Sequence, residues 1–138
     1  MPQVKELRGD HTVSLPVSGM AAPGTDNEQA AVVVPFNAKV TGVKWLPSAA
    51  VTSAATNFST LSVRNRGAAG SGTPLPASRS YNTGNPNSVA WVAEDMTLSG
   101  TASDLLVSAG DVLTVQMIHS GTGIQIPAGV VRISLQVR

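Results

Sequence analysis

The feature that most constrains the fold is an alternation of apolar and polar residues with a period of two. It is clearest at the end of the chain, in residues 130–138. Successive side chains of a β-strand point to opposite faces, so this pattern predicts a strand with one buried face and one polar face. The apolar set is Val131, Ile133, Leu135 and Val137, and the polar set is Arg132, Ser134, Gln136 and Arg138.

Runs of the same kind recur along the chain, separated by short segments rich in Gly, Pro, Asn and Ser, which favour turns. No segment shows the apolar stripe of an amphipathic helix. About eight short strands separated by turns indicate one all-β domain, either a β-sandwich or a barrel. We expect strands at residues 11–17, 29–35, 39–46, 58–64, 88–92, 97 with 105–107, 111–119 and 130–138.

The length of 138 residues is enough for one hydrophobic core without cross-links. Residues 1–28 differ from the rest, because they mix charges with Pro and Gly and have no clear periodicity. We expect them to form an N-terminal arm that is ordered against a neighbour, or an edge segment that lies along the domain, and a frayed terminus is the alternative. Residues 29–138 are expected to form the β-sandwich domain.

The composition excludes several classes of function. Without Cys, the chain has no disulfide, zinc–thiolate site or thiol nucleophile. A net charge of +1 gives no basic surface for nucleic acid or for an anionic membrane. The apolar runs are too short for a secretory signal or a membrane span, so we expect synthesis in the cytoplasm and no membrane partner.

Side chains that support catalysis are few and dispersed. His11 and His119 have no carboxylates near them at metal-ligand spacing, and Glu94 and Asp95 are expected to be solvated in a turn. No Ser lies in a nucleophile-elbow motif, and no Gly cluster opens a helix. We therefore expect no enzymatic activity, no cofactor and no metal site.

The two tryptophans, Trp45 and Trp91, both lie in strand-like runs that contain valine. Packing in the core is the expected role of both side chains, since large aromatic residues contribute strongly to cores. The alternative, that one of them anchors an interface, stays open.

Three segments carry a family resemblance: residues 36–45, 105–115 and 121–129. The second places Ala109-Gly110-Asp111 before a hydrophobic strand. Residues 30–138 resemble the capsid decoration (cement) proteins of tailed bacteriophages. The resemblance implies a single jelly-roll-like antiparallel β-sandwich that binds the major capsid protein on the outside of an assembled head and stabilises it. It also implies a homotrimer and a location on the exterior of the virion.

The N-terminal arm is the segment that we expect to reach the partner. The expected contact residues are Leu7, Arg8, Val13 and Leu15. Exchange of such an arm between subunits is a low-cost route to an oligomer.

Two other classes of function stay open. One is a structural or receptor-binding module of a phage tail or fibre, with residues 66–87 and 119–129 at its tip. The other is a carbohydrate-binding module, which would normally display exposed aromatic side chains.

Overall fold

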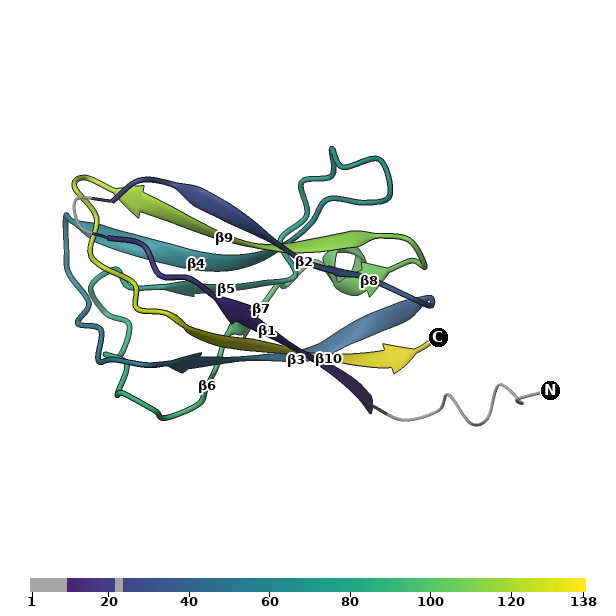
Figure 1. Cartoon of the computed structure of the whole chain (residues 1–138), viewed down its shortest axis with the longest axis horizontal. Coiled ribbons are helices and arrows are strands. Elements are labelled where there is room, and N and C mark those ends of the chain that lie inside the picture. The colour runs from purple at the N-terminus through teal and green to yellow at the C-terminus, as the bar shows by residue number, and fades with distance from the viewer. Residues whose placement is uncertain (1–9, 22–23) are drawn as a thin grey trace.

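The computed structural model describes residues 10–21 and 24–138. Within these ranges, ten β-strands form two five-stranded sheets that face each other (Figure 1). The first sheet has the order β1 (Asp10–Val17), β10 (Gly129–Val137), β3 (Ala38–Pro47) and β6 (Glu94–Asp95), with β8 (Leu106–Val107) also paired to β3. The second has the order β2 (Asn27–Val33), β9 (Val112–Ser120), β4 (Phe58–Asn65), β5 (Ala77–Ser80) and β7 (Thr97–Leu98). A 3₁₀ helix, η2 (Ala102–Leu105), precedes β8.

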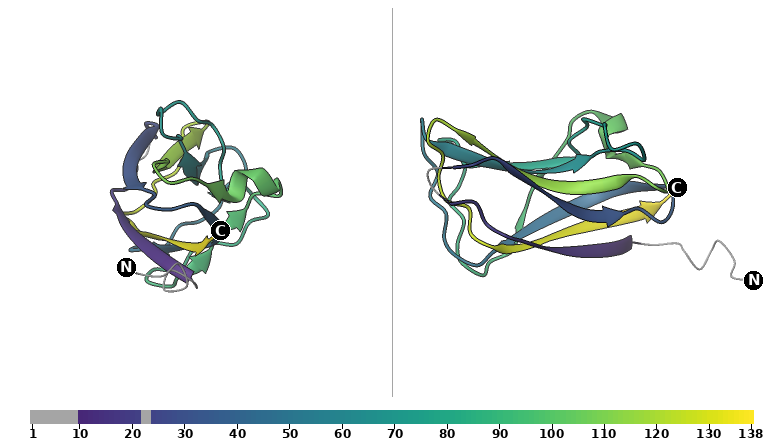
Figure 2. Two further views of the ribbon diagram at one scale, coloured as in Figure 1. Left: turned by 90° about the vertical axis from the view of Figure 1, so that its right-hand side faces the viewer. Right: turned by 45° about the horizontal axis from the view of Figure 1, so that its top comes forward.

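The strand pairing is antiparallel and nested. β1 pairs with β10, β2 with β9, β3 with β6 and β8, and β4 with β5. This nesting is that of a jelly roll, in which a long antiparallel hairpin rolls into two facing sheets. The left view of Figure 2 shows the two sheets from the end of the sandwich. The predicted fold class is therefore confirmed. One difference is that two short strands, β6 and β8, pair with β3 where a jelly roll usually has a single strand.

A β-bulge in β3 decides which of its side chains enter the core. Val40, Val43 and Trp45 are all buried, although an uninterrupted alternation would put Val40 on the opposite face from the other two. In the pairing with β10, the register shifts at Thr41, which has no partner residue. An extra residue in one strand reverses the alternation beyond it, so the bulge places Trp45 inside and Lys44 outside.

The core lies between the two sheets and is closed by large side chains from both. Burial of each such side chain contributes about 1.5–3 kcal/mol to the free energy of unfolding. In β10, the predicted inward residues Val131, Ile133 and Leu135 are buried. The largest fully buried side chains include Trp45, Tyr81, Leu61, Leu113, Met117, Ile126, Ile133 and Leu135.

Among residues 1–28, the structure describes an edge strand at residues 10–17. β1 lies at the edge of the first sheet and pairs with β10 along its whole length. Leu15 and Val17 of β1 belong to the core cluster. β2 begins at Asn27, so the sandwich also includes residues before the expected boundary at 29.

The structure corrects the prediction for residues 88–92, which do not form a strand. Ser88 makes an isolated bridge with Val51, and the residues after it form a turn. Conversely, the sequence pattern does not indicate β5 or β6. Both are short and polar, and β5 buries Arg79, whose charge is compensated by Glu94 of β6. No helix within the described ranges is long and apolar enough to cross a membrane.

Candidate functional site

The candidate site is built on the segment between β5 and β6, residues 81–93, which contains no charged residue. A buried polar network fixes its two ends. The Arg79 side chain, 8% exposed, forms an ion pair with Glu94 at 2.8 Å. The Ser88 hydroxyl donates to Glu94 at 2.7 Å and lies 2.7 Å from the Tyr81 hydroxyl, which also accepts the indole N–H of Trp45 at 3.0 Å. Because these groups satisfy one another, the network holds the segment in one conformation.

Arg79 also links the strand to the loop itself. Its guanidinium donates to the backbone carbonyls of Ser80 and Pro86, and it lies 4.2 Å from the centre of the Tyr81 ring. A planar guanidinium can donate several hydrogen bonds and stack on an aromatic face at the same time. The loop is therefore anchored in its middle as well as at its ends.

A tight turn at the end of this loop presents apolar side chains to solvent. The N–H of Val92 donates to the carbonyl of Val89 at 3.2 Å, and the N–H of Trp91 donates to the carbonyl of Pro47 at 2.8 Å. Trp91 has a φ of 63°, and it is the only residue other than Gly with a positive φ in the described part of the chain. A positive φ at the third residue is typical of a type II turn, where Gly is preferred. A bulky residue in this position is strained, and such strain often marks a functional site.

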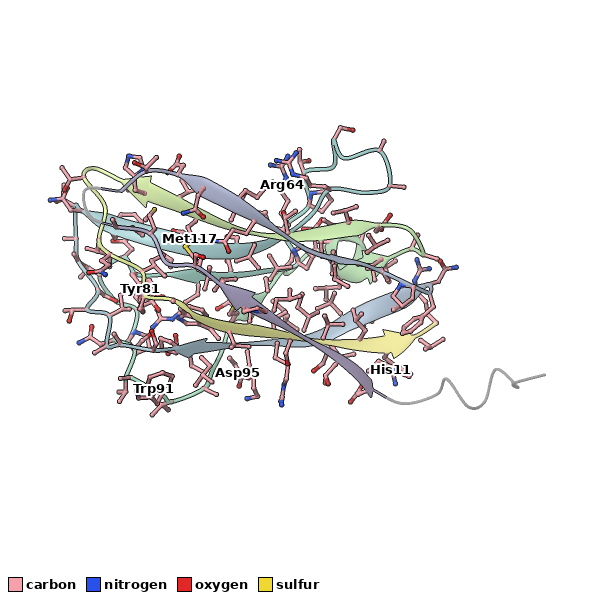
Figure 3. The ribbon with its side chains drawn as sticks, in the orientation of Figure 1. His11, Arg64, Tyr81, Trp91, Asp95 and Met117 are labelled. Carbon is pink, nitrogen blue, oxygen red and sulfur yellow. The ribbon has the colours of Figure 1, made fainter. Side chains whose placement is uncertain are left out.

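The side chains of this turn are among the most exposed apolar groups of the described residues. Trp91 is 71% exposed, Val89 61% and Val92 53%. Figure 3 places Trp91 at the outer edge of the sandwich, at the opposite end from His11. We call residues 89–92 the Trp91 turn. Its rigid support and its exposed aromatic ring are the properties of an interface anchor.

The two tryptophans differ in burial, although the sequence predicts the same core role for both. Trp45 is fully buried, as predicted. The prediction of a core role for Trp91 is wrong, because residues 88–92 do not pair as a strand and the side chain stays outside the sandwich. Two features of the local sequence are typical of an exposed segment: Trp91 follows a loop rich in Asn, and it lies in a segment without charged residues.

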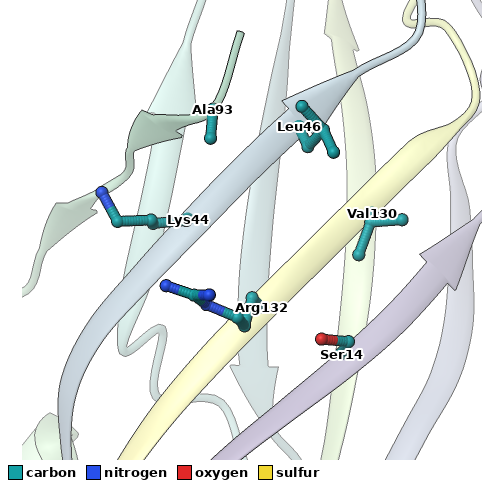
Figure 4. Close-up of a pocket in the computed structure, with 6 residues that line it drawn as sticks. All are labelled: Ser14, Lys44, Leu46, Ala93, Val130 and Arg132. Carbon is teal, nitrogen blue, oxygen red and sulfur yellow. The ribbon is translucent and has the colours of Figure 1, made fainter. Parts of the chain in front are cut away.

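A shallow hollow of about 260 Å³ lies on the outer face of the first sheet, next to the Trp91 turn (Figure 4). It adjoins the turn because Ala93 follows directly on Val92. The hollow combines apolar side chains with two cations, and Lys44 forms an ion pair with Asp95 at 2.8 Å. Its lining residues are Ser14, Lys44, Leu46, Ala93, Val130 and Arg132.

The expected partner-contact residues fall in two places. Leu7 and Arg8 lie outside the residues that the structure describes. Leu15 is buried in the core of its own chain, and Val13 packs against that core. The role of the four residues as partner contacts stays a prediction, but in this conformation Leu15 contributes to folding and does not present a surface.

The other ionisable candidates are placed in local contacts. Glu94 is half-buried in β6, which corrects the expectation of a solvated turn, whereas Asp95 is exposed as expected. His119 and Asp26 form a pair, with 2.6 Å between the ring Nδ1 and the carboxylate. The N–H of His119 also donates to Asp26, and these hydrogen bonds lower the pKa of this carboxyl below its ordinary value. The described residues contain no group of three or more His, Cys, Asp or Glu arranged to hold a metal ion.

Comparisons with known proteins add no relative: no family model matches the chain, and neither a curated protein nor a solved structure matches it.

Proposed function

We propose that this chain is a structural protein that binds the outer surface of an assembled phage capsid and stabilises it. The Trp91 turn carries the proposal, because it presents three exposed apolar side chains on a loop that a buried network already holds rigid. A large aromatic side chain on a pre-ordered support is the usual energetic centre of a protein interface. The partner is the major capsid protein, as the family resemblance implies.

The mechanism is stabilisation by mass action. A protein that binds the assembled state but not the separated subunits shifts the equilibrium towards assembly. In a trimer, one bound subunit raises the effective concentration of the other two at the surface, so each contact need only be weak. An interface centred on one small turn is therefore sufficient in each subunit.

The proposal is tested with capsids assembled from the major capsid protein encoded in the same genome. The wild-type chain is expected to sediment with these particles. A Trp91→Ser variant is expected to bind about 30-fold more weakly, because truncation of an interface Trp commonly costs that much. The matched control is Ile118→Ser, which removes a 43% exposed apolar side chain from β9 of the other sheet. Equal binding of the Trp91→Ser variant and the wild type would contradict the role of the turn.

Whole virions, which carry both a head and a tail, distinguish the two locations. Electron microscopy of labelled protein on whole virions is expected to place it on the capsid, and label on the tail or fibre would favour the alternative structural or receptor-binding module. Light scattering after size exclusion measures the expected trimer. Deletion of residues 2–9 tests the arm and leaves β1 intact, whereas deletion to residue 20 would also remove Leu15 and Val17 from the core.

A further inference from the structure

Two adjacent rows of side chains cross the outer face of the first sheet beside the Trp91 turn. The strand register places Ser14, Arg132, Lys44 and Asp95 next to one another on β1, β10, β3 and β6. Two residues further along, it places Pro16, Val130 and Leu46 next to one another on the first three of these strands. The hollow in Figure 4 spans both rows. It therefore has a cationic side and an apolar side.

The cationic side holds an uncompensated positive charge. Arg132 and Lys44 are directly opposite each other on neighbouring strands, an arrangement of like charges that is unfavourable. Lys44 is neutralised by Asp95 at 2.8 Å. Within residues 10–21 and 24–138, Arg132 has neither an ion pair nor a side-chain hydrogen bond. A carboxylate from a partner would relieve the repulsion and pair with Arg132.

The apolar side complements the Trp91 turn. Leu46 and Val130 form a patch on the open sheet face, and Ala93 connects this patch to Val92 and Trp91. The backbone hydrogen bond from Trp91 to Pro47, the residue after Leu46, fixes the turn against this edge of the sheet. An apolar side chain that enters the hollow would therefore contact a surface that is continuous with the exposed turn.

The spacing of the two rows indicates the shape of the occupant. Residues two apart in a strand lie about 7 Å apart and point to the same side. We propose that the hollow binds an extended protein segment with an apolar side chain at one position and a carboxylate two positions later. This inference rests on the proposed function in assuming a protein partner, and it adds the chemistry by which that partner is recognised.

The test uses the full chain and two acetylated, amidated peptides, Thr-Val-Thr-Glu-Thr and Thr-Val-Thr-Gln-Thr. Titration is followed by the backbone amide signals of the ¹⁵N-labelled protein. We expect shifts at residues 91–93 and 130–132 and about two- to fivefold tighter binding of the Glu peptide, within the range measured for one exposed ion pair. This preference should shrink as the salt concentration rises.

Two variants of equal charge change complete the test. Arg132→Gln is expected to remove the preference for the Glu peptide. Lys39→Gln, on the same sheet face but outside the hollow, is expected to retain it. Equal binding of the two peptides by the wild type, or a preference that survives in Arg132→Gln, would overturn the inference. Tighter binding of sialyllactose than of the Glu peptide would overturn it in favour of a saccharide site.

The peptide titration and the capsid-binding assay can fail independently, because the titration needs no capsids. Capsid binding that depends on Trp91, together with indifference to the Glu peptide, would refute the recognition chemistry and leave the proposed function standing. Selective binding of the Glu peptide without capsid binding would support the recognition chemistry and refute the proposed function.

Discussion

Replacement of Trp91 by Gly and by Ala tests whether the turn is strained. At a φ of 63° an L-residue with a side chain is about 1–2 kcal/mol less favourable than in the right-handed region, whereas Gly has no such penalty. Gly loses about 0.5–1 kcal/mol more conformational entropy on folding than Ala. Both variants lose the same indole contacts. The Gly variant is therefore expected to be more stable than the Ala variant by about 0.5–1 kcal/mol, the reverse of the usual order.

The assay is thermal unfolding followed by circular dichroism, with urea unfolding to obtain the free energy. For a chain of 138 residues the difference corresponds to about 2–4 °C in Tm. The control pair is Val92→Gly and Val92→Ala, because Val92 is also exposed and lacks a positive φ. At residue 92 Ala should be the more stable of the two.

A single result would refute the reasoning about strain. If Trp91→Ala is as stable as Trp91→Gly, residue 91 does not require the left-handed conformation. The inference that a strained Trp is retained for binding then loses its basis. If Trp91→Gly matches the wild type in stability and loses capsid binding, the side chain serves the interface at the expense of the fold.

Three further predictions concern polar groups. Glu94→Gln should lower the free energy of unfolding by about 2 kcal/mol in urea titrations, because it leaves the buried Arg79 guanidinium without its counter-charge. Hydrogen bonds from the backbone and ring of His119 lower the pKa of Asp26, so their contribution to stability is present above the ordinary pKa of 3.8 and lost as the pH falls through the folded value. Asp26→Asn should therefore flatten the pH dependence of Tm in this acidic range. Burial raises the pKa of Tyr81 above 10.0, so stability should fall as the pH rises through and above that value, with the absorbance at 295 nm reporting this single Tyr directly.

The Glu94→Gln prediction has a control variant, and all three predictions have an outcome that would contradict them. Asp95→Asn removes the neighbouring carboxylate, but its ion pair with Lys44 is exposed, so the loss should stay below about 0.5 kcal/mol. A similar loss for Asp95→Asn and Glu94→Gln would contradict the importance of burial. An unchanged acid limb of the stability curve in Asp26→Asn would contradict the assigned pKa shift. Ionisation of Tyr81 at its ordinary pKa without unfolding would show that its hydroxyl is accessible.

Much of the sandwich was predictable because its signal is local. β10 has a strict period of two, and a one-residue shift would expose all of its apolar side chains, so the sequence alone determines which face is buried. The existence of β4 and β9 was also predictable, because their runs of apolar and β-branched residues are long. Short strands such as β6 lack this signal, because two residues contain no period.

The candidate site was not predictable in the same way, because its geometry comes from residues far apart in the chain. The row that contains Arg132 exists only because β1, β10, β3 and β6 are neighbours in one sheet. The sequence by itself determined an all-strand domain and the buried face of its long strands, through the two-residue period of the β conformation. Only the tertiary structure decided that Trp45 is covered and Trp91 is exposed, because burial depends on which distant strands pack over a side chain.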